Sequence, residues 1–298
     1  MAPVLVALGA LAVLSSGLAG CGLSAAAPCN RTGRPPTRYQ HVLVLVEENR
    51  TWSGGGTPAV GLGFSARKMP FLHGLAAKCS YFRDWSETNS RQSSLTQYIG
   101  LTSGVSNPNT VNDCRPSATC QSTDNNIFRQ VRNAGGTPRN YVDGATTPCS
   151  TGSNATKHIP ALYYLAPQDA SHCTTEVRPL RNLNPDRLPT FALITPDECN
   201  DGHDCSDSTV DGFAKRLLTR ILDGASYRQG KTLVVVVYDE DRAVPNLIIA
   251  PASHRGAISS VVGSHAGLLK TVEQVLGLPV MQQGQLPGAV SLRSPANI

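Results

Sequence analysis

The 298-residue sequence carries little net charge and lacks the motifs of several common protein classes. Its formal net charge of +5 is spread over the whole chain, so we expect a solvated surface and no nucleic-acid partner. No Cys-x-x-Cys spacing occurs, which argues against a zinc site. The Gly-x-Ser-x-Gly elbow of serine esterases is missing, and Cys114-Arg-Pro-Ser-Ala118 only approaches the Cys-x-Pro-x-Arg sequence of sulfatases.

The N-terminal segment has the features of an export signal. Residues 3–19 are small and apolar almost without interruption, and this run is too short to span a bilayer comfortably. They lead into Leu18-Ala19-Gly20-Cys21, which matches the bacterial lipobox and predicts a lipid on Cys21. The alternative is an ordinary secretory signal that is cleaved near residues 25–27. We therefore expect an exported protein, held at the outer face of the cell membrane as a lipoprotein or secreted.

The rest of the chain is predicted to form one domain behind a short tether. Residues 22–38 are rich in Ala, Pro, Gly and Arg and show no periodicity. We predict a signal peptide over residues 1–20, a lipid-anchored tether over residues 21–38 and a domain over residues 39–298. Within it, residues 105–180 are expected to form a long disulfide-stapled excursion over one side.

The even number of cysteines after Cys21 predicts disulfide bonds, because an exported chain meets an oxidising compartment. Close spacing favours two short-loop bridges, a third pair is compatible with the spacing, and the fourth follows by elimination. The predicted pairs are, in that order, Cys114–Cys120, Cys199–Cys205, Cys149–Cys173 and Cys29–Cys79.

Three apolar runs, each followed by a polar cluster, predict the central strands. Short β-branched runs that are apolar on both faces are typical of strands inside a parallel sheet. The carboxyl ends of such strands meet at one edge, where ligands bind. The runs span residues 41–46, 191–194 and 233–237, and the clusters are Glu47-Glu48-Asn49, residues 197–204 and Asp239-Glu240-Asp241.

Helical patterns between these runs complete the predicted fold. Helices are expected over residues 69–78, 124–134 and 209–222 and after Ser264, with one further strand over residues 246–250. Strands that alternate with helices predict an α/β protein, a three-layer α/β/α sandwich with a mostly parallel central sheet.

The acidic clusters at residues 47–49 and 239–241 would repel each other at this edge unless a cation lay between them. Oxygen ligands favour a divalent metal cation such as Mg²⁺, Ca²⁺, Mn²⁺ or Zn²⁺. The sequence therefore predicts a metal-assisted hydrolase.

Ser94 is a candidate nucleophile. Ser93 and Ser94 precede a helix that is predicted to begin near Leu95, and in the simplest interpretation they only cap it. A helix N-terminus also holds an oxyanion or a phosphate, because free N–H groups and the helix dipole point at it. A serine in this position can cap the helix and attack a substrate.

Five segments, in the same order, resemble one family. They are Val46-Glu-Glu-Asn-Arg-Thr51, residues 92–104, residues 196–204, Tyr238-Asp-Glu-Asp241 and residues 264–273. Over residues 40–280 the chain resembles bacterial secreted phosphoesterases of the alkaline phosphatase superfamily. These include phospholipase C-like enzymes, acid phosphatases and phosphatidylinositol-3-phosphatase-like proteins. The resemblance implies an alkaline phosphatase-like fold and hydrolysis of a phosphate ester, for example of a phospholipid or a phosphoinositide.

The resemblance also implies roles for individual residues. Ser94, ten residues before Gly104, matches the family's metal-activated nucleophile, and His203 would contact the phosphate or protonate the leaving group. For His158 and His265 a purely structural role is the alternative. The implied metal ligands are Glu48, Asn49, Ser94, Asp239 and Glu240, and the implied substrate-binding residues are Asp201, His158 and His265.

The sequence departs from the family around Ser94. Gln92, Ser93, Thr96 and Gln97 replace four positions of the family's His-Pro-Ser-x-Pro-Asn-Tyr segment. Ser93 is the alternative nucleophile. The alternative function is a lipid-anchored binding protein that keeps the fold but has lost catalysis.

Overall fold

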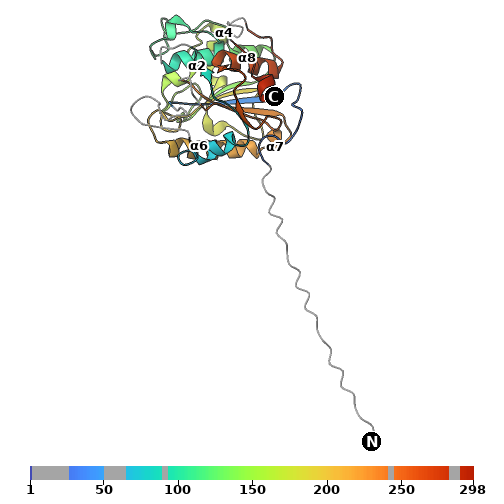
Figure 1. Ribbon diagram of the computed structural model, residues 1–298. Coiled ribbons are helices and arrows are strands. Elements are labelled where there is room, and N and C mark those ends of the chain that lie inside the picture. Colours follow the sequence, from blue (N-terminus) through green and yellow to red (C-terminus); the bar gives the residue numbers. More distant parts are fainter. Residues whose placement is uncertain (2–26, 50–64, 89–92, 241–244, 282–288) are drawn as a thin grey trace.

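The computed structural model describes Met1 and residues 27–49, 65–88, 93–240, 245–281 and 289–298, which form an eight-stranded sheet between two layers of helices (Figure 1). The strand order is β5-β4-β6-β1-β7-β8-β2-β9, and β8 alone among these strands runs antiparallel to its neighbours. The predicted three-layer, mostly parallel, alkaline phosphatase-like architecture is confirmed. The strands are β1 (His41–Glu47), β2 (Ser80–Phe82), β4 (Pro138–Val142), β5 (Val177–Pro179), β6 (Phe191–Thr195), β7 (Thr232–Tyr238), β8 (Leu247–Ile249) and β9 (Gly256–Ile258), with a separate parallel pair β3 (Trp85–Ser86) and β10 (Gly263–Ser264).

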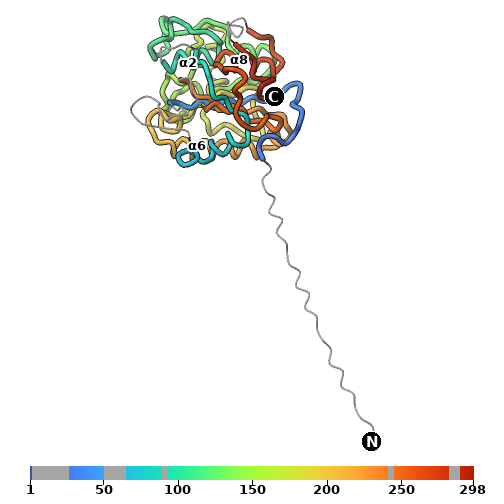
Figure 2. The backbone as a smooth tube through the Cα atoms, viewed as in Figure 1, coloured from blue at the N-terminus to red at the C-terminus, as the bar shows by residue number. Residues whose placement is uncertain are grey.

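Helices that are distant in sequence pack side by side on each face of the sheet. On one face α2 lies against α8, and on the other α1 lies against α6 (Figures 1 and 2). The Ser264 hydroxyl accepts a hydrogen bond from the Gly267 amide, so the predicted cap of the last long helix is confirmed. The helices of the described residues are α1 (Pro70–Ala76), α2 (Ser94–Ser103), α3 (Ile127–Asn133), α4 (Pro167–Ala170), α5 (Cys173–Glu176), α6 (Asp207–Leu222), α7 (Ala225–Arg228), α8 (His265–Leu276) and α9 (Arg293–Ala296), and the same residues form four short 3₁₀ turns.

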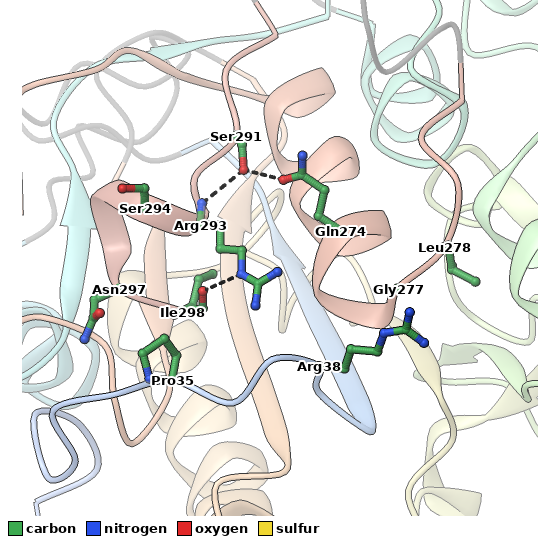
Figure 3. A pocket seen from close by; sticks show the side chains of 10 residues that line it. All are labelled: Pro35, Arg38, Gln274, Gly277, Leu278, Ser291, Arg293, Ser294, Asn297 and Ile298. Carbon is green, nitrogen blue, oxygen red and sulfur yellow. Dashed lines mark hydrogen bonds between the residues drawn. The ribbon is translucent and has the colours of Figure 1, made fainter.

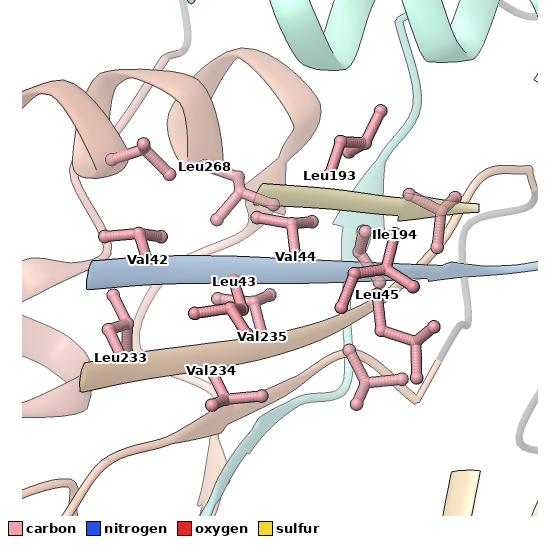
Figure 4. Packing of buried hydrophobic residues seen from close by; sticks show 14 of the residues in the cluster. Val42, Leu43, Val44, Leu45, Leu193, Ile194, Leu233, Val234, Val235 and Leu268 are labelled. Carbon is pink, nitrogen blue, oxygen red and sulfur yellow. The ribbon is translucent and has the colours of Figure 1, made fainter. Parts of the chain in front are cut away.

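The three predicted apolar runs form the middle of the sheet. Val44 of β1 lies beside Leu193 of β6 and Val235 of β7, and all three side chains are buried (Figure 4). Burying side chains of this size contributes roughly 1.5–3 kcal/mol each. The same register places Glu47 opposite Tyr238, so the residues that follow both strands leave the sheet at one level.

Residues 105–180 do not form only an excursion, as the sequence predicted, because they supply two strands of the sheet. β4 pairs with β6 over five positions, and β5 pairs with β4. All four predicted disulfide pairs are confirmed. They are Cys29–Cys79, Cys114–Cys120, Cys149–Cys173 and Cys199–Cys205.

The segment predicted as a tether packs on the domain from Pro28 onward. The Tyr227 hydroxyl donates to the Pro28 carbonyl at 2.7 Å, and the Arg31 amide donates to the Pro251 carbonyl at 2.8 Å. The Cys29–Cys79 disulfide explains this docking, because it ties the segment to the start of β2. The predicted signal peptide and Cys21 lie outside the described residues. In the part of the chain that the structure describes, no helix has the length and apolar character needed to cross a membrane.

Candidate active site

The polar clusters after β1, β6 and β7 meet at the carboxyl edge of the sheet. The Asp239 amide donates to the Glu47 carbonyl at 3.1 Å, which continues the ladder between β1 and β7 by one residue. The Glu48 amide donates to the Asp201 carbonyl at 2.9 Å, which fastens the loop after β6 to the same level. The side chains of Glu48, Asp201 and Asp239 are fully buried there.

A negative charge on Asp239 is disfavoured at this edge. Burial and the negative charges of Glu48 and Glu240 raise the pKa of Asp239 well above its ordinary value. No nitrogen or hydroxyl donor of the described residues reaches either Asp239 oxygen. Buried carboxylates without donors are costly, and a divalent cation is the partner that oxygen ligands of this kind fit. The residues present therefore suit a hard metal ion.

His158 joins two of the buried acids. Its Nε2 lies 3.0 Å from Glu48 Oε1 and its Nδ1 lies 3.2 Å from Asp201 Oδ2. Burial opposes a charge on the ring, but the two carboxylates outweigh it and raise the pKa of His158 to about 10. The ring stacks on Tyr98 with centroids 5.1 Å apart. His158 is thus a buried imidazolium that neutralises part of the acidic cluster.

The two acids respond differently to this histidine. Burial raises the pKa of Glu48, but the charge and hydrogen bond of His158 outweigh it and lower the value to about 2. For Asp201, burial dominates and raises the pKa to about 6, although His158 opposes it. Glu48, His158 and Asp201 lie close enough to one another to hold an ion, but both ring nitrogens of His158 already face carboxylates. We therefore interpret His158 as an internal cation.

Ser94 is the first residue of α2, and its side chain contacts the acid that follows Asp239. The Ser94 hydroxyl donates to Glu240 Oε1 at 3.5 Å, and the residue is only 4% exposed. The structure contradicts the simple capping interpretation of the two serines, because neither hydroxyl caps α2. Asp113 takes this part: its Oδ1 accepts the Leu95 amide at 3.0 Å and the Ser93 hydroxyl at 2.9 Å.

A disulfide-closed loop presents His203. The Cys199–Cys205 bridge closes the loop, and the His203 amide donates to Asp201 Oδ1 at 2.8 Å. The His203 side chain is 33% exposed, with Nδ1 at 2.7 Å from Asp204 Oδ1 and Nε2 at 3.3 Å from Lys157 Nζ. The ring therefore lies at the open side of the buried cluster, 6.0 Å between centroids from His158.

His265 lies behind the end of β7. Its Nδ1 is 3.1 Å from the Thr88 hydroxyl and its Nε2 is 3.3 Å from the Tyr238 carbonyl. Burial lowers the pKa of His265 to about 4, so the ring is neutral near pH 7. Both nitrogens thus face protein groups, which is the arrangement of the structural alternative rather than of a substrate contact.

The remaining predicted ligands follow the strand ends. Asn49 is half-buried and has a φ of +53°, a left-handed conformation that asparagine tolerates. Glu240 is 7% exposed and faces Ser94.

The departures from the family pattern serve the packing of α2. The Thr96 hydroxyl donates to the Thr110 carbonyl at 3.0 Å. Gln97 Oε1 accepts the Thr88 amide at 2.7 Å. Gln92 lies outside the described residues. The three described departures, Ser93, Thr96 and Gln97, are thus all engaged with neighbouring loops.

Sequence reasoning missed three residues of the site. Tyr98 stacks on His158, Lys157 contacts His203, and Asp113 caps α2 from a distant loop. Tyr98 stands inside the resembling segment 92–104 and Lys157 directly precedes the predicted residue His158, so both could have been assigned from their neighbours in the sequence. Asp113 gave no local signal, because it acts on a helix that begins 19 residues earlier in the sequence.

The structure also excludes the sulfatase interpretation. Cys114, the residue that a sulfatase would use as its modified nucleophile, is bonded to Cys120. Its position after Asp113 makes it part of the loop that holds α2.

Solved structures with a similar fold include a member of the alkaline phosphatase superfamily. A superfamily protein from Vibrio parahaemolyticus has a TM-score of 0.53 at 14% identity, covering 84% of this chain and 70% of that chain. The lipoteichoic acid synthase LtaP from Listeria monocytogenes has a TM-score of 0.52 at 11% identity, covering 82% and 73%. The fold therefore defines an alkaline phosphatase-like α/β protein.

Sequence comparison identifies the family. The phosphoesterase family matches residues 56–243, and the chain belongs to this family. The phosphatidylinositol-3-phosphatase of Mycobacterium tuberculosis (strain ATCC 25618 / H37Rv) is 26% identical over 284 residues, which cover 92% of this chain and 89% of that protein. The chain is accordingly an enzyme that hydrolyses phosphate esters, and the predicted class is confirmed.

Proposed function

We propose that this phosphoesterase is metal-dependent and uses Ser94 as its nucleophile. The observation that carries the proposal is the pair of buried carboxylates Glu48 and Asp239, which follow neighbouring strands: His158 favours the ionised form of Glu48, and the negative charge of Glu48 raises the cost of ionising Asp239. Ser94 reaches the same cluster through Glu240 at 3.5 Å. A cation at this point would compensate the acids and lie beside the hydroxyl.

The proposed ligands are Glu48, Asn49, Ser94, Asp239 and Glu240. When bound, a divalent cation would neutralise phosphate oxygens and favour the ionised form of the Ser94 hydroxyl. His158 and Asp201 act by positioning in this proposal. His158 holds Glu48 through its 3.0 Å contact, and Asp201 orients the His203 loop through its 2.8 Å hydrogen bond.

The residues of the chain then support two successive displacements at phosphorus. Ser94 Oγ attacks the phosphorus while the bond to the leaving oxygen breaks in line, and the Ser94 proton passes to Glu240 Oε1. His203, at the open side of the site, or a water molecule protonates the leaving oxygen. Water next attacks the phosphoseryl group, the bond between phosphorus and Oγ breaks, phosphate leaves, and Oγ regains a proton.

We further propose a phosphoinositide or phospholipid head group as the substrate and a lipid anchor at Cys21. Support for the substrate comes from the mycobacterial relative, which is a phosphatidylinositol-3-phosphatase. Support for export comes from the four disulfides, which persist only in an oxidising compartment.

Hydrolysis of p-nitrophenyl phosphate by the purified protein tests the metal-dependent mechanism. We expect activity that a chelator abolishes and that a divalent cation restores after the chelator is removed. A panel of phosphoinositides and phospholipids, assayed for released phosphate, then tests the substrate. Activity that survives chelation and dialysis undiminished would contradict the metal-dependent mechanism, and hydrolysis of p-nitrophenyl phosphate without any lipid hydrolysis would contradict the substrate.

A further inference from the structure

Asp113 connects two parts of the site that are distant in sequence. Its Oδ1 accepts hydrogen bonds from the Leu95 amide and the Ser93 hydroxyl at the start of α2, at 3.0 and 2.9 Å. Its Oδ2 lies 3.8 Å from Lys157 Nζ. One carboxylate thus holds the helix that carries Ser94 and, with its other oxygen, a lysine from another loop.

Lys157 stands between this carboxylate and His203. Its Nζ is 3.3 Å from His203 Nε2, and its side chain is only 19% exposed. The next residue, His158, is fixed between two buried acids, so the backbone that carries Lys157 is anchored at the site. An ammonium group has three donors; one faces Asp113 Oδ2 across an ion pair of 3.8 Å, which is longer than a hydrogen bond, and a second faces His203 Nε2 at 3.3 Å. The third remains for an oxygen of a bound anion.

Resting on the function proposed above, we infer that Lys157 binds a non-bridging oxygen of the substrate phosphate and that Asp113 is a positioning residue that aligns Lys157 with Ser94. The Asp113 carboxylate contacts both the start of α2 and the Lys157 ammonium group. The distance between the Ser94 hydroxyl and this ammonium group therefore does not depend on the independent motion of two loops.

Replacing Lys157 with Met keeps an unbranched side chain that is one atom shorter and removes its charge. We expect the KM for p-nitrophenyl phosphate to rise about tenfold or more, as for a lost charge-assisted hydrogen bond, with kcat changed less than about threefold. The inhibition constant of inorganic phosphate should rise in parallel. An unchanged KM together with unchanged phosphate inhibition would overturn the assignment of Lys157.

Two substitutions at Asp113 separate its two contacts. Asp113→Asn keeps an oxygen for the α2 amide and tolerates the left-handed φ of +49°, but loses the charge that faces Lys157. We expect KM to rise about threefold with kcat nearly unchanged, and no further rise when Asp113→Asn is added to Lys157→Met. Asp113→Ala loses both contacts and should also lower kcat about tenfold, because Ser94 is displaced.

Asp211 offers a matched control. Its carboxylate accepts the Phe71 and Leu72 amides at the start of α1, so it caps a helix across the fold as Asp113 does, but on the other face of the sheet. Asp211→Ala should lower the unfolding temperature with kcat and KM unchanged. If Asp113→Ala behaves in the same way, its role is structural only and the positioning role is wrong.

The wild type and Ser94→Ala separate this inference from the proposed function. If Ser94→Ala abolishes hydrolysis but Lys157→Met has the KM of the wild type, the inference about Lys157 is wrong and the proposed function stands. If the wild type hydrolyses no phosphate ester, the proposed function fails. Stabilisation by inorganic phosphate, measured by thermal unfolding, still tests Lys157 in that case, since Lys157→Met should abolish it and an undiminished shift would overturn the inference.

Discussion

The two edges of the central sheet differ in whether their charged side chains have partners of the opposite polarity. At the amino edge, a hollow of about 750 Å³ lies between the chain before β1, the end of α8 and the C-terminal residues (Figure 3). Arg293 in its wall donates to the carbonyls of Ile298, Pro36 and Thr37 at 2.7–3.2 Å. At the carboxyl edge, the acids Glu48 and Asp239 are buried beside each other.

The difference shows that open volume is a poor guide to the site of this protein. The charged arginine in the wall of the hollow is engaged with main-chain oxygens, so its role is to hold the two ends of the domain together. The acids at the carboxyl edge oppose folding unless something compensates them. We therefore expect changes at the carboxyl edge to affect activity and changes at the amino edge to affect stability.

Removal of the Ser94 hydroxyl gives the largest expected effect. Ser94→Ala should lower kcat by about 10³-fold or more, because no other nucleophile replaces the lost oxygen, while the unfolding temperature stays within a few degrees of wild type. Steady-state assays and thermal unfolding measure the two quantities. Ser93→Ala is the matched control and should keep most of the activity. A reversal of these two results would make Ser93 the nucleophile.

Opening the Cys29–Cys79 disulfide tests the amino edge. Replacing both cysteines with serine frees a loop with a sequence separation of 50 and should lower the free energy of unfolding by about 4 kcal/mol, with activity preserved in the folded fraction. Denaturant unfolding and assays below the transition give the two values. Opening Cys199–Cys205, with a separation of 6, should cost only about 2 kcal/mol yet lower activity, because it releases His203. Equal activity loss in both variants would contradict the division between the edges.

Asp239→Asn should stabilise the protein in the absence of a metal and should weaken the stabilisation that a bound metal provides. In chelator the variant should unfold at a higher temperature than wild type, because one of the repelling charges is gone. With a divalent cation it should gain less stability than wild type and show about 100-fold lower activity. Thermal unfolding with and without metal measures this. Asp211→Asn, a control at a paired carboxylate, should lose stability in both conditions, and the same behaviour of Asp239→Asn would speak against a metal here.

Glu273→Gln gives the smallest expected effect. Burial raises the pKa of Glu273 to about 7, above the 4.5 of an unfolded chain. The folded state therefore binds the proton more tightly, and the stability that this contributes is complete below pH 4.5 and lost as the pH rises through 7.

Glutamine keeps an oxygen for the Met281 amide and does not ionise. The variant should thus be more stable than wild type by about 1–3 kcal/mol at pH 8 and should show a flatter dependence of unfolding free energy on pH. Asp186→Asn removes a charge from an exposed loop and should leave the slope unchanged. If the unfolding free energy of Glu273→Gln depends on pH as steeply as that of the wild type, the Glu273 carboxyl is not the cause of this pH dependence.

Periodicity alone was enough to predict the centre of the sheet. The runs that became β1, β6 and β7 are apolar on both faces, which few other structures require. β4 escaped prediction, because it begins with Pro138 and buries Asn140, whose amide donates to the Thr195 hydroxyl at 3.3 Å. A strand stabilised by a buried polar contact to its neighbour leaves no apolar pattern in its own sequence.

The site divides in the same way. The acids after β1 and β7 could be placed together from strand order, because parallel strands end at one edge. The role of Asp113 could not be predicted from the sequence, because it depends on how the loop beside the Cys114–Cys120 disulfide packs against α2. The role of His265 also depended on the structure, because only packing places its two nitrogens against Thr88 and Tyr238.

The contact between Pro28 and Tyr227 determines the point at which an N-terminal membrane anchor would be connected to the domain. Tyr227 lies just before β7, so the chain joins the domain at the amino edge, opposite the buried acids. With a lipid on Cys21, the seven residues to Pro28 (28 − 21) would reach about 25 Å at most, whereas the domain is on the order of 40 Å across. With the amino edge toward the membrane, the carboxyl edge would point away from it. The site would then meet head groups of an opposing membrane or esters in solution. Lipids of its own leaflet would be reached only if the domain tipped over.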